Sequence, residues 1–207
     1  MNLAEFLTHI LALENDPTKG VFTDAQNTVG LRVALYRYSV LRPYHSSSLF
    51  DGADTTVHTL TGLTALAIRK VWHVQTDPQN NIELDFHAWL NSGEWHIATL
   101  DYSVPTGTNN ILVDTSIAHT IEDLDSGAAT TIPLEDQTPV AEYAAGYAIL
   151  GKANSNIENN NLNPYETKNY IEMGTLFQNN FNSQILKDND QIRTANWHDK
   201  RTVDGNF

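Results

Sequence analysis

Residues 22–44 read FTDAQNTVGLRVALYRYSVLRPY and predict a long amphipathic helix. Thr23 suits the N-cap, and Gln26 three residues later completes a capping box. Apolar side chains then recur at helical spacing. They form one stripe that a second set widens (Ala25, Val29, Val33, Tyr36 and Val40; then Leu31, Leu35, Tyr38 and Leu41). We expect the helix to end near Arg42, because the residue before a proline disfavours helical backbone.

Three further helices are expected, one before this stretch and two after it. Residues 3–14 carry large apolar side chains at helical spacing until Asn15-Asp16-Pro17 interrupts the pattern. A third, alanine-rich helix begins near Thr138, which suits an N-cap, with Pro139 in the first helical position. After a break at residues 159–164, a fourth helix ends near Lys187 and carries one apolar stripe (Tyr170, Met173, Phe177, Phe181 and Ile185).

Between the second and third helices the apolar pattern becomes short and alternating, which is typical of half-buried strands. Residues 44–56 are rich in Ser, Asp and Thr and are expected to form a loop. Strands are expected at residues 57–60, 68–76, 82–88, 95–99 and 111–120, separated by turns at 77–81, 91–93 and 105–110. Several short strands in this length of chain predict a small antiparallel sandwich or barrel.

These patterns together predict an α+β fold. A helical bundle body of about four helices would carry a small antiparallel β-sandwich or barrel insertion and an extended C-terminal tail. The expected parts are residues 1–43 and 134–187 for the bundle, 44–133 for the β insertion, and 188–207 for the tail. The tail lacks helical periodicity, and its charges balance when Lys187 is counted with it.

Composition excludes several classes of protein. The 207 residues hold 12 Lys and Arg against 25 Asp and Glu, for a formal net charge of −13, and no Cys. A disulfide scaffold, a cysteine zinc site and a thiol nucleophile are therefore excluded. The charge argues against capture of nucleic acid or of an anionic membrane surface. Residues 1–5 carry no basic segment, and no apolar run approaches the roughly 20 residues of a membrane span, so we expect neither secretion nor membrane insertion.

The chemical motifs of common enzymes are absent from the sequence. We find no GxSxG, GxGxxG or GxxxxGK[ST], so we expect no catalytic residue, metal or cofactor. Two alternatives stay open. A metal-dependent hydrolase would use two pairs of ligands spaced along strands (Asp85 with His87, and Glu94 with His96). A carbohydrate- or receptor-binding sandwich would need Trp72, Trp89 and Trp95 exposed on one face.

Two features predict protein contacts instead. The polar tail contains Trp197, Val203 and Phe207, which are suitable anchors for a segment that docks on a partner. The third helix is unusually small-sided, with Ala141, Ala144, Ala145 and Ala148 among its residues. Small side chains allow close approach, either of another helix in the same chain or of a second subunit.

The layout resembles the head–tail adaptor (connector or neck) proteins of tailed bacteriophages and prophages. The resemblance is carried by residues 22–44, by the strands around Trp72, and by two later stretches. One is ILVDTSIAHTIEDLD (111–125), in which His119 falls at a position that is often His in such proteins. The other is TIPLEDQTPVAEYAAGYAILGKANSNI (131–157), an Ile-Pro lead into an Ala-rich helix.

The resemblance implies a structural, non-enzymatic protein of the virion neck, assembled in the host cytoplasm. It implies a homo-oligomeric ring, commonly of twelve copies, beneath the portal, with a stopper or tail protein below and no membrane contact. DNA would pass through an acidic channel without specific binding. The tail would contact the portal (Ala195, Asn196, Trp197, His198, Lys200, Arg201, Val203 and Phe207). Another neck component, a stopper or tail terminator, is the alternative and would contain more strand and less helix.

Overall fold

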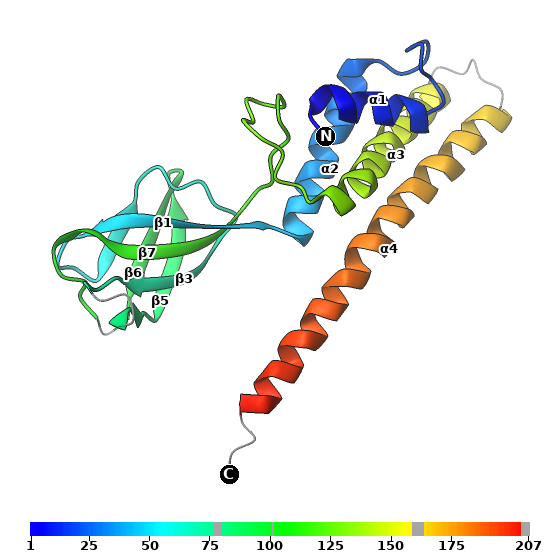
Figure 1. The fold of residues 1–207 in the computed structure, drawn as a ribbon. Helices are drawn as coiled ribbons and strands as arrows, with labels where there is room; N and C mark the ends of the chain where they lie inside the picture. The colour runs from blue at the N-terminus through cyan, green and yellow to red at the C-terminus, as the bar shows by residue number, and fades with distance from the viewer. Residues whose placement is uncertain (77–79, 101, 159–163, 204–207) are drawn as a thin grey trace. The chain divides into compact units, whose positions relative to one another are not determined.

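The computed structural model describes residues 1–76, 80–100, 102–158 and 164–203, with the side chains of residue 158 and of residues 187–203 left out. The chain divides into two compact units. The helical unit consists of Met1–Arg42 and His119–Phe207, and the β unit consists of Pro43–Ala118 (Figure 1). The predicted α+β fold class is confirmed.

The helical unit is built from four helices: α1 (Leu3–Leu13), α2 (Asp24–Leu41), α3 (Leu134–Glu158) and α4 (Pro164–Val203). Helix α3 packs against both α2 and α4, and α1 packs against α3 (Figure 1). The main core lies between these helices and the segment that leads into α3. Its buried residues are Phe6, Ile10, Leu31, Ala34, Tyr38, Ile121, Leu124, Ile132, Val140, Ala141, Ala144, Ala145, Phe181 and Ile185.

The predicted start of α2 is confirmed at the level of its cap. Thr23 accepts a hydrogen bond from the backbone N–H of Gln26, whose side chain accepts one from the backbone N–H of Thr23. Between α1 and α2, the carboxylate of Asp16 accepts hydrogen bonds from the backbone N–H groups of Gly20, Val21 and Phe22 at 2.9, 2.7 and 2.8 Å. These bonds hold the pKa of Asp16 below its usual value. The link between the two helices is therefore a fixed turn.

The face that α2 buries differs from the predicted one. Val29, Tyr36 and Val40 of the predicted stripe are exposed, whereas Leu31 and Tyr38 of the set expected to widen it lie in the core with Ala34. The reason is a close approach of backbones. A Cβ atom added at Gly30 would lie 2.6 Å from the carbonyl oxygen of Ala144 in α3, so only a glycine fits there. The helix turns its smallest residues toward α3, and the stripe faces away.

Helix α3 begins at Leu134, four residues before the predicted start, and Pro139 lies inside it. Hydrogen bonds to the rest of the unit hold this first turn although proline donates none. The carboxylate of Asp136 accepts from Tyr38, and the amide of Gln137 donates to the carbonyl of Ile132 at 3.0 Å. The prediction used the local proline signal, whereas the helix start is set by these tertiary bonds.

Helix α4 continues to Val203, so the predicted end near Lys187 and the extended form of the tail from residue 188 are wrong. The sequence holds no proline or glycine between Gly174 and Gly205 that would interrupt a helix. Of the predicted break before α4, residues 159–163 lie outside the described residues.

The β unit contains two antiparallel sheets. The strands are β1 (Tyr44–Gly52), β2 (Val57–Leu60), β3 (Ala67–His73), β4 (Ile82–Glu83), β5 (Phe86–Asn91), β6 (Glu94–Thr99) and β7 (Gly107–Ile117). One sheet has the order β1-β7-β3-β4 and the other the order β2-β6-β5. Their shared core consists of Leu60, Val71, Leu84, Ile97, Val104, Ile111 and Val113.

Two predictions about the β unit are wrong. Residues 44–52 form strand β1 rather than a loop, because they pair with β7 from Tyr44 opposite Ile117 to Gly52 opposite Gly107. Pairing with a distant strand supplies the stability that this serine-rich segment lacks locally. The strand expected at residues 82–88 is divided between β4 and β5, which lie in different sheets. In the described part of the chain, no helix is long and apolar enough to cross a membrane.

Candidate interaction surfaces

The exposed side of α2 forms an apolar surface on the helical unit. We call Val29, Val33, Tyr36 and Val40 the α2 outer face; Val29, Tyr36 and Val40 are 47%, 66% and 51% exposed. Such a row on a surface helix is typical of a protein contact. It follows the helix for about 16 Å, at 1.5 Å per residue.

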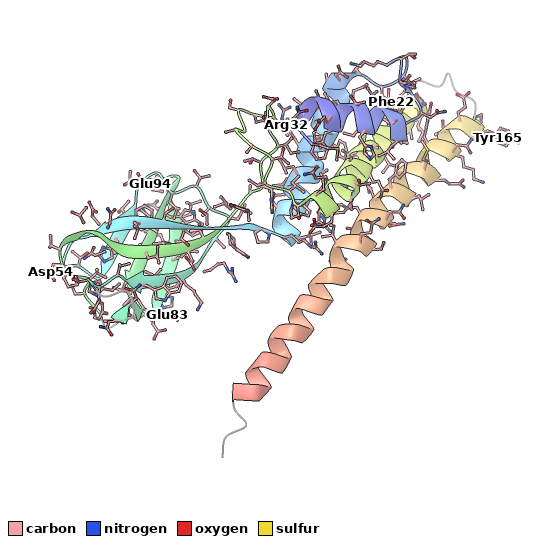
Figure 2. The ribbon with its side chains drawn as sticks, viewed as in Figure 1. Phe22, Arg32, Asp54, Glu83, Glu94 and Tyr165 are labelled. Atoms are coloured by element: carbon pink, nitrogen blue, oxygen red, sulfur yellow. The ribbon has the colours of Figure 1, made fainter. Side chains whose placement is uncertain are left out.

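Arginines flank the α2 outer face on both sides. Arg32 (Figure 2) forms two hydrogen bonds through Nε to the carboxylate of Asp125, at 2.8 and 3.0 Å, and holds the pKa of that carboxyl below its usual value. Arg37 forms no ion pair with any of the described residues. The sequence contains no acidic residue from Ala25 to Leu41, so α2 itself supplies no partner for Arg37.

The exposed side of α4 forms a second surface. We call Lys168, Glu172, Leu176 and Leu186 the α4 outer face; Leu176 and Leu186 are 56% and 45% exposed. Their spacing places all four on one side of the helix. Lys168 and Glu172 form an exposed ion pair with a 3.6 Å separation between Nζ and Oε1.

The two outer faces belong to helices that contact α3 at different points around it. On one side, the backbone of Ala144 approaches Gly30 of α2; on another, Gly146 approaches Gly174 of α4, where an added Cβ would lie 2.9 Å from the Gly146 carbonyl oxygen. Ala144 and Gly146 are two positions apart, which is about 200° around a helix. At these contacts α3 therefore lies between α2 and α4, whose outer faces point in different directions. Near Arg42, which donates to the carbonyl of Ile185 at 3.3 Å, the end of α2 also reaches α4.

The four alanines singled out in the sequence lie inside the helical unit. Ala141, Ala144 and Ala145 have no exposed surface, and Ala148 is 9% exposed. They occupy helix contacts within one chain, and Ala144 lies where the backbone of α2 approaches α3.

A buried polar cluster lies where the chain leaves and re-enters the helical unit. Arg42 and Asp136 form an ion pair of 2.7 Å, and the hydroxyl of Tyr38 donates to the same carboxylate at 2.6 Å. Burial, followed by the bond to Asp136, raises the pKa of Tyr38 well above its usual value. No sequence pattern marks this cluster, because its partners are far apart in the chain.

His119 belongs to the same region and links both passages of the chain. Its Nε2 lies 2.9 Å from the carbonyl oxygen of Arg42, which only accepts, so this nitrogen carries the hydrogen. Nδ1 then accepts from the hydroxyl of Thr131 at 3.0 Å, and the backbone N–H donates to Ser39 Oγ at 2.9 Å. A histidine satisfied on both nitrogens in this way is structural.

The predicted portal-contact residues fall at the end of α4. Residues 195–198, 200, 201 and 203 lie on its helical backbone, and Phe207 lies outside the described residues. Among the described side chains of α4, the last one buried in the core is Ile185.

The residues of the hydrolase alternative do not form a metal site. Among the described residues, no group of three or more His, Asp or Glu side chains is placed to hold a metal ion. His96 instead stacks on Trp89 across strands β5 and β6, with ring centroids 5.5 Å apart, and contacts Thr59 through Nδ1 at 3.1 Å.

The three tryptophans of the carbohydrate-binding alternative do not share a face. Trp72 lies on β3 in the four-stranded sheet, whereas Trp89 and Trp95 lie in the other sheet. Trp89 is paired with His96 and Trp95 with Leu90, so the two rings point to opposite faces. Trp95 packs against the core of the β unit and donates to the carbonyl of Ala65 at 3.3 Å.

No family model matches this chain, and no curated protein matches it. Among solved structures, the chain is similar to one in a structure described as the neck of an empty GTA particle computed with C6 symmetry. The two share 16% sequence identity with a TM-score of 0.32, and the match covers 71% of this chain and 77% of the other.

Proposed function

We propose that this protein is a structural head–tail adaptor of a tailed phage, which forms a ring beneath the portal and surrounds the path of the DNA. The observation that carries the proposal is the helical unit with a β unit inserted between α2 and α3 and with apolar outer faces on α2 and α4. A building block with two different contact faces suits a closed ring. The resemblance of residues 22–44, 111–125 and 131–157 to such adaptors points to the same role.

The charge of the chain supports a role around DNA. The β unit contains eight acidic residues and two basic ones, Arg69 and Lys70, and the whole chain carries −13. A ring wall with this charge repels phosphate groups, so that DNA slides past it without adhering. We therefore propose passage of DNA through the ring and no sequence-specific binding.

We propose that the end of α4 makes the contact with the portal, through Ala195–His198, Lys200, Arg201, Val203 and Phe207. Trp197 and Phe207 supply the aromatic area that dominates many protein contacts. A copy number of twelve, a stopper or tail protein below the ring, and a place in the virion neck belong to the same proposal.

A stopper or tail terminator was the alternative expected to contain more strand and less helix. Helices α3 and α4 alone contribute 25 and 40 of the 207 residues, which is more than a quarter of the chain. This proportion favours the adaptor.

Deletion of Ala195–Phe207 tests the proposal. The truncated and full-length proteins are each mixed with DNA-filled, tail-less capsids, and bound protein is measured by sedimentation and by electron microscopy of the portal vertex. We expect the truncated protein to keep its circular dichroism melting curve and to lose attachment. A variant with Leu90→Ala, an exposed position of the β unit, serves as the control and should attach normally. Normal attachment of the truncated protein would contradict the portal contact.

A further inference from the structure

We infer that the α2 outer face of one copy docks on the α4 outer face of a second copy of this chain. The inference rests on the proposed ring and names the surfaces through which neighbouring copies meet. It places the contact on exposed residues, because the small-sided face of α3 is already filled by α2 and α4 of the same chain.

Both helices expose apolar side chains on their outer faces. Val29, Tyr36 and Val40 form a continuous row that leaves about half or more of each side chain in water. On α4, Leu176 and Leu186 are exposed to a similar degree. Covering such side chains is favourable in proportion to the apolar area removed from water.

The two outer faces point in different directions. They belong to helices that contact α3 at different points around it, α2 at Ala144 through Gly30 and α4 at Gly146 through Gly174. A pair of different faces that point in different directions joins copies head to tail, and repeated head-to-tail contacts close into a ring. If the α2 outer face docked on itself, the assembly would stop at a two-fold dimer.

Charges of opposite sign also lie at the two outer faces. Arg37 borders the α2 outer face and has no ion pair among the described residues, and the adjoining segment of α2 carries no acidic residue. The α4 outer face carries Glu172, whose partner Lys168 lies at 3.6 Å in an exposed pair. Such an exposed ion pair is weak. Glu172 can therefore readily exchange Lys168 for a guanidinium that becomes partly desolvated in a contact. The carboxylate of Glu172 and the guanidinium of Arg37 are thus complementary.

The exposed apolar residues span similar lengths on the two helices. Val29 and Val40 are separated by about 16 Å along α2, and Leu176 and Leu186 by about 15 Å along α4, at 1.5 Å per residue. Two helices packed side by side can therefore cover both rows at once.

The absence of cysteine from the sequence allows a direct test, because no native thiol competes with the introduced ones for the cross-linker. Three single variants of the full-length protein are prepared, namely Tyr36→Cys, Leu176→Cys and, as a control on the exposed surface of the β unit, Leu90→Cys. The double variant Tyr36→Cys/Leu176→Cys is the fourth. Each is treated with a bismaleimide cross-linker over a range of protein concentrations that extends to the highest attainable, and the products are separated by denaturing electrophoresis.

We expect the double variant to give a ladder of covalent oligomers, and an equal mixture of the two single variants to give mainly dimers. Each single variant alone should give no more dimer than Leu90→Cys. Adding Arg37→Glu to the double variant should reduce the ladder several-fold, and adding Glu172→Arg as well should restore it. The restoration separates a contact between these charges from a general loss of folding.

Strong dimer formation by Tyr36→Cys alone would overturn the head-to-tail pairing in favour of a two-fold contact. A double variant that gives no ladder at any concentration would overturn the inference altogether. The proposed function is judged separately by attachment to capsids. A ladder without attachment would leave the contact standing and remove the adaptor role, whereas attachment without a ladder would do the reverse.

Discussion

The side-chain amide of Asn27 in α2 donates a hydrogen bond to Oε2 of Glu14, the residue that ends α1, at 2.8 Å in the interior of the helical unit. Both residues are buried, and within the described residues Glu14 Oε1 and Asn27 Oδ1 have no partner. The pKa of Glu14 is raised to about 7. Burial is the main cause, the nearby carboxylate of Asp16 adds to it, and the hydrogen bond from Asn27 opposes it. A protonated Glu14 would donate through Oε1 to Asn27 Oδ1 and satisfy both oxygens with one proton.

We expect this pair to make stability fall with rising pH. Because the pKa of Glu14 is higher in the folded state than in the unfolded state, the folded protein binds the proton more tightly. The contribution is complete below about pH 4.5 and is lost as the pH rises through about 7. Glu14→Gln keeps the shape and cannot ionise, so it should be more stable than the parent protein at pH 8 by about 1–3 kcal/mol and close to it at pH 5. Urea unfolding at both pH values measures the difference; an equal effect at both would contradict the assignment.

Asn27→Asp should replace the favourable contact of this pair with a repulsive one. It places a second carboxyl group against Glu14 at a buried position, where two negative charges cannot both be tolerated. We expect a loss of about 2–4 kcal/mol at pH 8 and a clearly smaller loss at pH 5, where one proton can be shared. The double variant Asn27→Asp/Glu14→Gln is the control, and it should recover most of the loss at pH 8 when unfolding is followed by circular dichroism.

Gly30→Ala tests the close approach of α2 to α3. The added Cβ would meet the carbonyl oxygen of Ala144 at 2.6 Å, and a backbone atom cannot move aside cheaply. We expect a loss of about 1–3 kcal/mol in the free energy of unfolding. Gly151→Ala is the matched control, because nothing lies within 4 Å of an added Cβ at that exposed helical position. It should be neutral or stabilising by up to about 1 kcal/mol. Similar effects of the two substitutions would contradict the packing described for Gly30.

Asp136→Asn tests the buried cluster at the base of the β insertion. The substitution removes the carboxylate charge that pairs with Arg42 in a mostly buried place, and it weakens the bond from Tyr38. We expect a loss of about 2–4 kcal/mol. Asp125→Asn removes the partner of Arg32, which lies on the surface, and should lower stability far less than Asp136→Asn. Thermal melting of both variants under the same conditions distinguishes the two environments.

The residues near the start of α2 show what could be predicted from sequence. The capping box of Thr23 and Gln26 involves residues three apart, so the sequence contains all the information needed. The buried face of the same helix depends on α3, which lies more than 90 residues further along the chain. Counting apolar residues favoured the row with Val29, Tyr36 and Val40, although the Gly30 and Ala34 pair, four residues apart, was the signal of a close helix contact.

Strand β1 and the end of α4 differ from prediction for related reasons. The serine-rich β1 has little strand propensity of its own and forms through pairing with β7. The end of α4 lacks an apolar stripe, yet nothing in the sequence breaks the helix before Gly205. The α2 outer face was missed because its residues were assigned to the core.

The hydrogen bond between His119 Nε2 and the carbonyl of Arg42, at 2.9 Å, brings together the two points where the chain departs to the β unit and returns from it. To the helical unit, residues 43–118 are therefore equivalent to a long loop between two positions that already touch. Insertions at such positions are well tolerated, because the scaffold is not rearranged by what it carries. In evolutionary terms the β unit is an exchangeable module: lineages could replace, trim or enlarge it while the four helices kept their packing, and an engineer could graft a different domain at the same two residues.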